Sequence, residues 1–304
     1  MRWASSLLVL AAHLGCGASS SSSSPRDGGD MDGADGIDAG TDGANNDGSV
    51  TSLDGGATGD DGAPISDATA SADLDRDGIP DAQELAWADA YFPYYSIHPS
   101  DGCKTHGVLF RMMPHPQQAA RIVVIYVVLY DADCGASGHS GDDEVFAIVF
   151  DPKRPAPGGI LAVRAISHQD TPCEHDTTCG QCSGMPACGT ATRAGKAYPA
   201  VYPSKDKHGT YADLATCSSS FICDFGGCAL SAAPDAPPFV NAGEPGHPLV
   251  SDLTTNGFVT TANGWTHTDL QHFDPWKAGS FGGAGDVSND LVDTRFVVDT
   301  SACP

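Results

Sequence analysis

RIVVIYVVLY (residues 121–130) is a nearly unbroken run of β-branched and aromatic side chains. The run is too short and too rich in valine and isoleucine for a helix, so it predicts a strand. Because no alternating polar positions interrupt it, we expect this strand to be buried on both faces, at the centre of a sheet.

Other short apolar segments follow this run, separated by clusters of Gly, Pro, Asn and Asp. They predict strands at residues 145–150, 159–166, 197–202, 258–261 and 295–299. Helix signals are sparse after residue 91. The pattern therefore predicts a mainly β fold: an antiparallel β-sandwich with long disulfide-pinned loops and a short N-terminal helix.

The N-terminus carries a targeting signal. An apolar segment, residues 4–14, is too short to span a bilayer and is followed by Gly-Cys-Gly, which is typical of a secretory signal peptide. The ending HLGC resembles a bacterial lipoprotein cleavage site, although His13 stands where leucine is usual. The resemblance implies a signal peptide at residues 1–16, a lipidated Cys16, and an exported lipoprotein of the outer membrane or cell surface; the alternative is a secreted protein.

Cysteine usage agrees with export. The sequence has 11 cysteines, and ten remain if Cys16 carries a lipid, which is an even number available for disulfides. Proximity favours pairs within residues 173–188 and within 217–228, but ten cysteines allow many pairings. The alternative is a tetrahedral zinc site made of four thiolates: Cys173, Cys179, Cys182 and Cys188.

Composition divides the chain into a tether and a domain. Residues 17–72 are mainly Ser, Gly, Asp and Ala and carry 11 Asp against one basic residue, Arg26, so they predict a disordered acidic tether. Residues 73–304 are long enough for one domain with its own core. This domain is also acidic, with 28 acids against 13 bases, which argues against nucleic acid as a partner and favours bound cations.

Residues 73–84 read DLDRDGIPDAQE and match the calcium-loop pattern D-x-D-x-D-G-x5-E. Alternate carboxylates face one centre, Gly78 permits the sharp turn, and the predicted ligands are Asp73, Asp75, Asp77, the carbonyl of Ile79, Asp81 and Glu84. No helix pattern precedes the loop, and this resembles thrombospondin type 3 calcium loops. We expect loop and helix at residues 73–91 and the β-sandwich at 92–304; the alternative is an acidic turn without metal.

A second group of candidate ligands stands at the entrance of a predicted strand, in GHSGDDEVFAIVF (residues 138–150). Because strand side chains alternate, Asp142 and Glu144 share one face and Asp143 takes the other. A pocket for a divalent cation, Ca²⁺ or Mg²⁺, is predicted from four residues: His139, Asp142, Glu144 and His208. Asp131 and Asp133 could add oxygen ligands or serve as turn residues. The alternative is a hydrogen-bonded cluster that only fixes a loop.

Three motifs resemble the vacuolar-protein-sorting-associated protein 62 family. The frame H-x-G-D-x-E of residues 139–144 is similar to that family's HxGDWE signature, and residues 84–99, ELAWADAYFPYYSIHP, resemble its opening. A later segment is similar through Pro199, Val201, Tyr202, Ser204, His208 and Tyr211. The resemblance spans residues 84–211 and implies a β-sandwich.

A more distant resemblance is to the necrosis- and ethylene-inducing-like proteins. Their GHRHDWE heptapeptide compares with GHSGDDE at residues 138–144. That resemblance implies a sandwich with an acidic, cation-binding cavity. Gly141 stands where their second histidine lies and Asp143 where both families have tryptophan, so lipid recognition and toxicity do not carry over.

Three functions remain open at this point. The first is a tethered, calcium-stabilised module whose acidic pocket recognises a glycan or lipid headgroup. The second is a metal-dependent hydrolase of phosphodiesters or glycosides, in which Asp142 or Glu144 activates water and His139 or His208 acts as acid or base. The third is a structural surface protein. Because the sequence has neither a GxSxG elbow nor an HExxH motif, we predict the binding module and assign no catalytic residue.

Overall fold

The computed structural model describes residues 72–304 apart from 104, 221, 235–236, 261–266 and 282–284. The predicted signal peptide, Cys16 and residues 17–71 of the predicted tether lie outside these residues. In the described part of the chain, no helix combines the length and the hydropathy needed to cross a membrane.

A six-stranded sheet forms the centre of the domain. Its strands lie in the order β10 (Phe239–Asn241), β2 (Thr105–Pro114), β3 (Ile122–Ala132), β4 (Ser140–Phe150), β5 (Ile160–Ser167) and β6 (His175–Gly180). All neighbours are antiparallel except β10 and β2. Every residue of β3 up to Tyr130 is buried, so the prediction of a central strand buried on both faces is confirmed.

A smaller sheet packs beside the first. It contains β1 (Tyr94–Tyr95), β8 (Lys196–Pro203), β7 (Thr190–Arg193) and β9 (Thr210–Tyr211), and β1 is parallel to β8. β11 (Gly243–Glu244) and β12 (His247–Pro248) form a short hairpin. The helical segments are α1 (Asp81–Tyr91), α2 (Leu214–Ser219), η1 (Thr255–Gly257), α3 (Thr268–Gln271), α4 (Val287–Asp290) and η2 (Thr294–Phe296).

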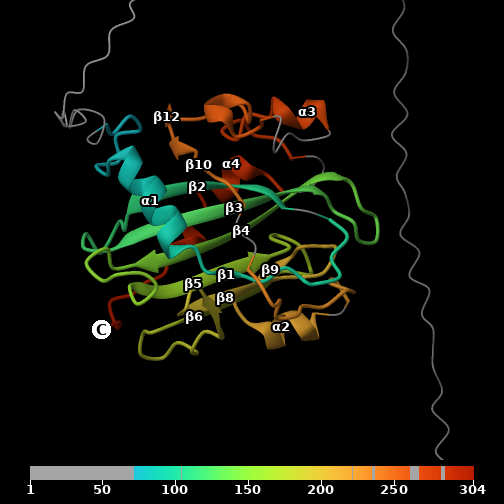
Figure 1. Cartoon of the computed structure of the whole chain (residues 1–304), viewed down its shortest axis with the longest axis horizontal. Helices are drawn as coiled ribbons and strands as arrows, with labels where there is room; N and C mark the ends of the chain where they lie inside the picture. Colours follow the sequence, from blue (N-terminus) through green and yellow to red (C-terminus); the bar gives the residue numbers. More distant parts are fainter. Residues whose placement is uncertain (1–71, 104, 221, 235–236, 261–266, 282–284) are drawn as a thin grey trace, which may run out of the picture. The chain divides into compact units, whose positions relative to one another are not determined.

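The two faces of the central sheet bury different partners. Tyr126 and Phe146 pack on one face against α1 and the β1–β8 sheet, whereas Val127 and Val145 pack on the other against the C-terminal segment. Figure 1 shows the long strands β2, β3 and β4 between these two layers, with β1, β8 and β9 on one side and α3 and α4 on the other. The protein is thus mainly β and consistent with a β-sandwich, as predicted.

Two predicted strands are wrong. Residues 255–257 form η1, Phe258 continues in helical geometry, and residues 294–296 form η2, whose first turn is capped by Asp293. The apolar side chains Phe258, Phe296 and Val298 are buried against the central sheet from loops and turns. Apolar content therefore indicated burial correctly here but not strand pairing. β2, which has no uninterrupted apolar run, was not predicted.

Five disulfides join the ten cysteines of the domain: Cys103–Cys134, Cys173–Cys223, Cys179–Cys188, Cys182–Cys303 and Cys217–Cys228. The pairs expected from proximity are present at 179–188 and 217–228. All four thiols of the alternative zinc site are consumed, so that alternative is wrong.

Candidate functional site

The acidic loop of residues 73–84 leads directly into α1. Gly78 has φ +95°, in the region that glycine adopts without strain, and Arg76 has φ +67°. The backbone N–H of Asp81 donates to the carbonyl of Ala72 at 2.8 Å and closes the loop. The chain thus turns tightly enough to bring alternate aspartates together.

Carboxylate oxygens of the loop converge in two overlapping groups. One contains Asp73, Asp75 and Asp81, and the other contains Asp75, Asp77 and Glu84; within each group the oxygens lie within 4.8 Å of one another. Asp75 is 1% exposed, and neither of its carboxylate oxygens has a hydrogen-bond partner among the described residues. The arrangement leaves several oxygens directed at one small volume.

Burial and mutual repulsion disfavour the charged forms of these carboxyls. Burial, with a smaller contribution from Asp77, raises the pKa of Asp75 to about 7. Burial, with Asp75 and Asp77 adding to it, raises the pKa of Glu84 to about 9. A bound divalent cation would reverse both effects, because it compensates the charge where water is excluded.

Glu84 joins the loop to the sheet. Its Oε2 accepts a hydrogen bond from the side-chain amide of Asn241 in β10 at 2.8 Å, while Oε1 has no partner among the described residues. One oxygen thus anchors the side chain and the other faces the loop. A hydrogen bond from a neighbouring side chain, here the amide of Asn241, is typical of carboxylates that hold a metal ion in a fixed orientation.

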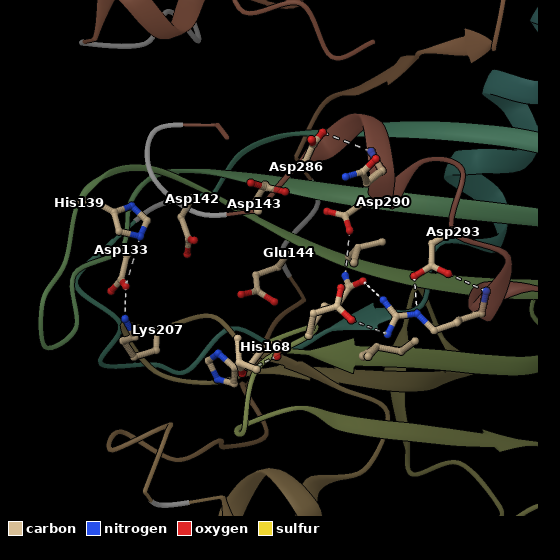
Figure 2. Close-up of a pocket in the computed structure, with 18 residues that line it drawn as sticks. Asp133, His139, Asp142, Asp143, Glu144, His168, Lys207, Asp286, Asp290 and Asp293 are labelled. Carbon is tan, nitrogen blue, oxygen red and sulfur yellow. Dashed lines mark hydrogen bonds and ion pairs between the residues drawn. The ribbon is translucent and has the colours of Figure 1, made fainter. Parts of the chain in front are cut away.

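An acidic cleft with a volume of about 670 Å³ lies at the start of β4. Eight carboxylates line it, against two permanently cationic side chains, Lys207 and Arg295. β4 pairs with β5 only from Phe146 onward, so its preceding residues have an open edge on that side. As predicted, Glu144 lies on one side of this edge and Asp143 on the other (Figure 2).

His208 lies buried between two carboxylates. Its Nδ1 is 2.7 Å from Asp142 Oδ2, its Nε2 is 3.4 Å from Asp101 Oδ1, and its ring stacks on Tyr130 with centroids 3.7 Å apart. Burial alone lowers the pKa of His208, but the bonds to the two carboxylates outweigh it and raise the pKa to about 9. In this structure His208 is therefore a cation that neutralises Asp142.

His139 lies further out at the mouth of the cleft. Its Nδ1 is 2.7 Å from the carbonyl of Gly141, and its Nε2 is 3.8 Å from Asp133, which also pairs with Lys207. Asp131 faces away toward His106, with 3.3 Å between its Oδ1 and the histidine Nδ1. Of the two acids that end β3, Asp133 belongs to the cleft.

Asp143 is buried in the cleft wall, and Glu144 is half-buried there. Glu144 Oε2 accepts a hydrogen bond from the backbone N–H of Thr210 at 3.2 Å. Burial, followed by the neighbouring Asp142, raises the pKa of Glu144 well above its usual value. Burial, followed by Asp290, does the same for Asp143.

His168 and Asp224 form a pair that the sequence did not reveal. His168 Nε2 is 3.0 Å from Asp224 Oδ2, and the fully buried carboxylate also accepts from Ser204 and Tyr211. Nδ1 of His168 makes no hydrogen bond with the described residues, and the ring lines the cleft. Fifty-six positions separate the two residues, so no local spacing could have indicated the pair.

The structure assembles the two predicted sites to different degrees. The carboxylates predicted for the calcium loop come together. In the pocket, Asp142 contacts His208, while His139 and Glu144 bond to backbone groups instead. Across the described part of the chain, groups of three ligand atoms within 4.8 Å occur in the loop and not in the cleft.

Comparison with known proteins adds little to this picture. No family model and no curated protein matches the sequence. One solved structure, titled "Toxin fold for microbial attack and plant defense", is similar to 51% of this chain and 72% of its own, with 13% identity and a TM-score of 0.28.

Proposed function

We propose that the protein is an exported, calcium-stabilised binding module, tethered to a membrane through a lipid on Cys16. Calcium occupies the loop of residues 73–84, and the acidic cleft holds a cation and recognises a glycan or lipid headgroup. The observation that supports this most is the set of buried carboxylate oxygens without partners in the loop. Such groups are costly unless a metal compensates them.

The donor set of the loop suits calcium. All its candidate ligands are oxygens, from Asp73, Asp75, Asp77, Asp81, Glu84 and the carbonyl of Ile79, and hard oxygen ligands in this number favour Ca²⁺ over smaller or softer ions. Calcium would neutralise the repelling carboxylates and fix the start of α1. The loop is therefore assigned a stabilising role.

The cleft is the part of the domain suited to a ligand. Its volume lies within the range of small-molecule sites, and its charge is strongly negative. Asp142, Glu144 and His139 could hold a divalent cation, Ca²⁺ or Mg²⁺, on one side of β4, and hydroxyl or phosphate oxygens of a glycan or headgroup would complete its coordination.

Calcium titration of the whole protein tests the loop. We expect Ca²⁺ to raise the free energy of unfolding by about 2.7 kcal/mol at a hundred times its Kd. Asp75→Asn should abolish most of this gain, whereas the control Asp170→Asn, an 88% exposed side chain in a weak ion pair, should retain it. An unchanged response of Asp75→Asn would refute the assignment.

Metal titration also tests the cleft. The double variant Asp142→Asn with Glu144→Gln should lose one class of Ca²⁺, Mg²⁺ or Mn²⁺ sites by calorimetry and keep the loop site. If its isotherms equal those of the unaltered protein, the cleft holds no divalent cation.

A metal-dependent hydrolase is the second candidate. The His168–Asp224 pair favours it, because a histidine held by a carboxylate can accept a proton at its other nitrogen. Phosphodiester and glycoside substrates should then be cleaved only with metal, and His168→Gln should remove the activity. Uniform inactivity of the unaltered protein would leave the binding module.

A further inference from the structure

The cationic side chains of the domain are unevenly distributed. In the part of the chain that the structure describes, eight Lys and Arg side chains pair with a carboxylate. The four that form no ion pair with the described residues are Arg76, Lys153, Arg154 and Lys196. Arg76 lies in the acidic loop, whereas the other three come from two segments that meet at the end of β4 opposite the cleft.

Hydrogen bonds hold these three cations in one patch. The backbone N–H of Lys153 donates to Asp151 Oδ1 at 3.0 Å, and that of Arg154 donates to the carbonyl of Asp151 at 3.1 Å. Lys196, in β8, donates from its Nζ to the carbonyl of Ala156 at 3.1 Å. Lys153 and Lys196 are exposed, and Arg154 is half-buried. The patch therefore presents to solvent three cations that form no ion pair with the described residues.

Two paired cations extend the patch. Arg121 Nη1 lies 2.5 Å from Asp151 Oδ2. Arg193 faces Lys196 in the β7–β8 hairpin, and its Nη2 lies 3.0 Å from Asp89 Oδ1. We call the whole group the basic pole; its members are Arg121, Lys153, Arg154, Arg193 and Lys196.

The basic pole keeps a positive charge after its acidic neighbours are counted. Asp151 and Asp89 pair with two of its members, and Asp299 bonds to Gln118, whose carbonyl accepts from the backbone N–H of Arg121. Five cations against these three carboxylates leave a charge of +2. The domain as a whole has 28 acids and 13 bases, so the pole has the opposite sign to its surroundings.

The unpaired cations of the pole contribute little to the fold. The side chain of Lys153 makes no hydrogen bond with the described residues, and that of Arg154 makes one long contact of 3.4 Å with Gln181. Single exposed lysines are ordinary, but like charges that are held together repel one another. A group of this sign on an acidic protein indicates an anionic partner.

A bilayer with anionic headgroups fits the basic pole. Anionic lipid surfaces attract Lys and Arg side chains, and each such residue near the surface strengthens partitioning about fivefold. The rest of the domain is acidic and would be repelled by the same surface. Charge alone therefore selects the end of the domain that approaches the membrane.

The cleft lies toward the other end of the same strand. Glu144 in the cleft is seven positions before Asp151 at the pole, which is about 24 Å at about 3.4 Å per strand residue. Contact through the basic pole would therefore turn the cleft away from the bilayer.

We propose that the basic pole holds the domain on the anionic surface of the membrane and leaves the acidic cleft facing outward. The inference rests on the proposed attachment to a membrane through Cys16, and it adds which face of the domain meets the lipid. It also narrows the ligand of the cleft. In this orientation the cleft takes a glycan or headgroup from outside, not a lipid of the membrane that carries the protein.

Lysine labelling on vesicles tests the orientation. Protein beginning at Cys16 is joined through that thiol to a maleimide lipid, since the other ten cysteines are in disulfides. A water-soluble amine-acylating reagent then reports the reactivity of each lysine by mass spectrometry. The vesicles contain either phosphatidylglycerol with phosphatidylcholine or phosphatidylcholine alone.

The pole should be shielded on the anionic vesicles. We expect Lys153 and Lys196 to react about fivefold or more slowly there than on the neutral vesicles. Lys277, whose side chain is 81% exposed in the C-terminal segment, is the internal control and should react at nearly the same rate on both. Salt at about 1 M, where the Debye length is about 3 Å, should remove the shielding.

Matched variants separate charge from crowding. Lys153→Ala with Arg154→Ala should bring the rate of Lys196 on anionic vesicles to within about twofold of its rate on neutral ones, because two of the three unpaired cations are gone. Lys153→Arg with Arg154→Lys keeps both charges and should keep Lys196 shielded. Lys277→Ala, which removes a cation elsewhere, should also keep it shielded.

The outcomes distinguish this inference from the proposed function. Equal reactivity of Lys153 and Lys196 on the two kinds of vesicle would overturn the inference. Shielding that extends to Lys277, or that survives the double alanine variant, would do the same. The proposed metal sites are titrated in solution and stand apart from these results. Because the maleimide lipid replaces acylation in the cell, an exported protein without lipid on Cys16 would count against that part of the proposed function alone.

Discussion

His208 shows how a single residue sets the charge of the cleft. It is fully buried and bonds to both Asp142 and Asp101, so its cation compensates two carboxylates that water does not reach. Removing one member of such a group leaves the others buried and unpaired. The side chain therefore matters for folding as well as for the local field.

Replacement of His208 gives a direct prediction. His208→Gln should lower the free energy of unfolding by about 3 to 5 kcal/mol, as measured by urea denaturation. His272→Gln, at a side chain that is 71% exposed, should change it by less than about 0.5 kcal/mol. A loss below about 1 kcal/mol at His208 would show that Asp101 and Asp142 are solvated or protonated instead.

Residues that act together through local spacing were predictable. The aspartates at 73, 75 and 77 are two positions apart, and alternation alone put Asp142 and Glu144 on one side of β4 and Asp143 on the other. Asp101, Asp224 and Asp290 gave no such signal, because the side chains that bring them to the cleft, those of His208, His168 and Gln169, lie 56 to 121 residues away. Their roles depend on how the chain folds back on itself.

The acidic loop of residues 73–84 behaves as one titrating element. Without metal, burial raises the pKa of Asp75 to about 7 and that of Glu84 to about 9. Because the folded state then holds protons that the unfolded chain releases, the stability of the metal-free protein falls as pH rises from about 4.5 toward 9. The proposed calcium ion would replace these protons and should cancel the slope.

This linkage is measurable. We expect the melting temperature without calcium to decrease between pH 5 and 8, and the gain on adding calcium to increase over the same interval. At pH 7, calorimetry in buffers of different ionisation enthalpy should detect release of on the order of one proton per calcium bound. A calcium gain independent of pH would contradict protonation of Glu84 in the metal-free loop.

Prediction of the elements succeeded where apolar runs were continuous. β3, β4 from Val145 onward and β5 read as strands because both of their faces are buried, so nearly every position there is apolar. β2 was missed because His106, Gly107 and Arg111 interrupt its apolar positions. The segments near Phe258 and Phe296 were wrongly predicted to be strands. Their apolar side chains cover the sheet, but their backbones do not pair with it.

Disulfides hold together segments that are distant in sequence. Cys182–Cys303 joins the C-terminus to the region after β6 across 121 positions, while the neighbouring Cys179–Cys188 spans 9. Closing a longer loop restricts the unfolded chain more strongly. The long-range bridge should therefore contribute more to stability than its neighbour.

The two bridges can be compared directly. Replacing Cys182 and Cys303 with serine should lower the free energy of unfolding by about 5 kcal/mol, against about 3 kcal/mol for Cys179 and Cys188, in equilibrium urea unfolding. An equal or reversed order would show that the loss arises from packing in the folded state, not from the freedom of the unfolded chain.

The closure of the acidic loop also determines how the molecule responds to force. A pull applied at Ala72 reaches the fold through the 2.8 Å hydrogen bond from Asp81, and from there through Glu84 and Asn241 into the six-stranded sheet. Without calcium, that load path runs through two hydrogen bonds. If calcium binds the loop as proposed, its ionic crosslinks would act in parallel with these hydrogen bonds, so the calcium concentration would set the tension at which the N-terminal end peels away.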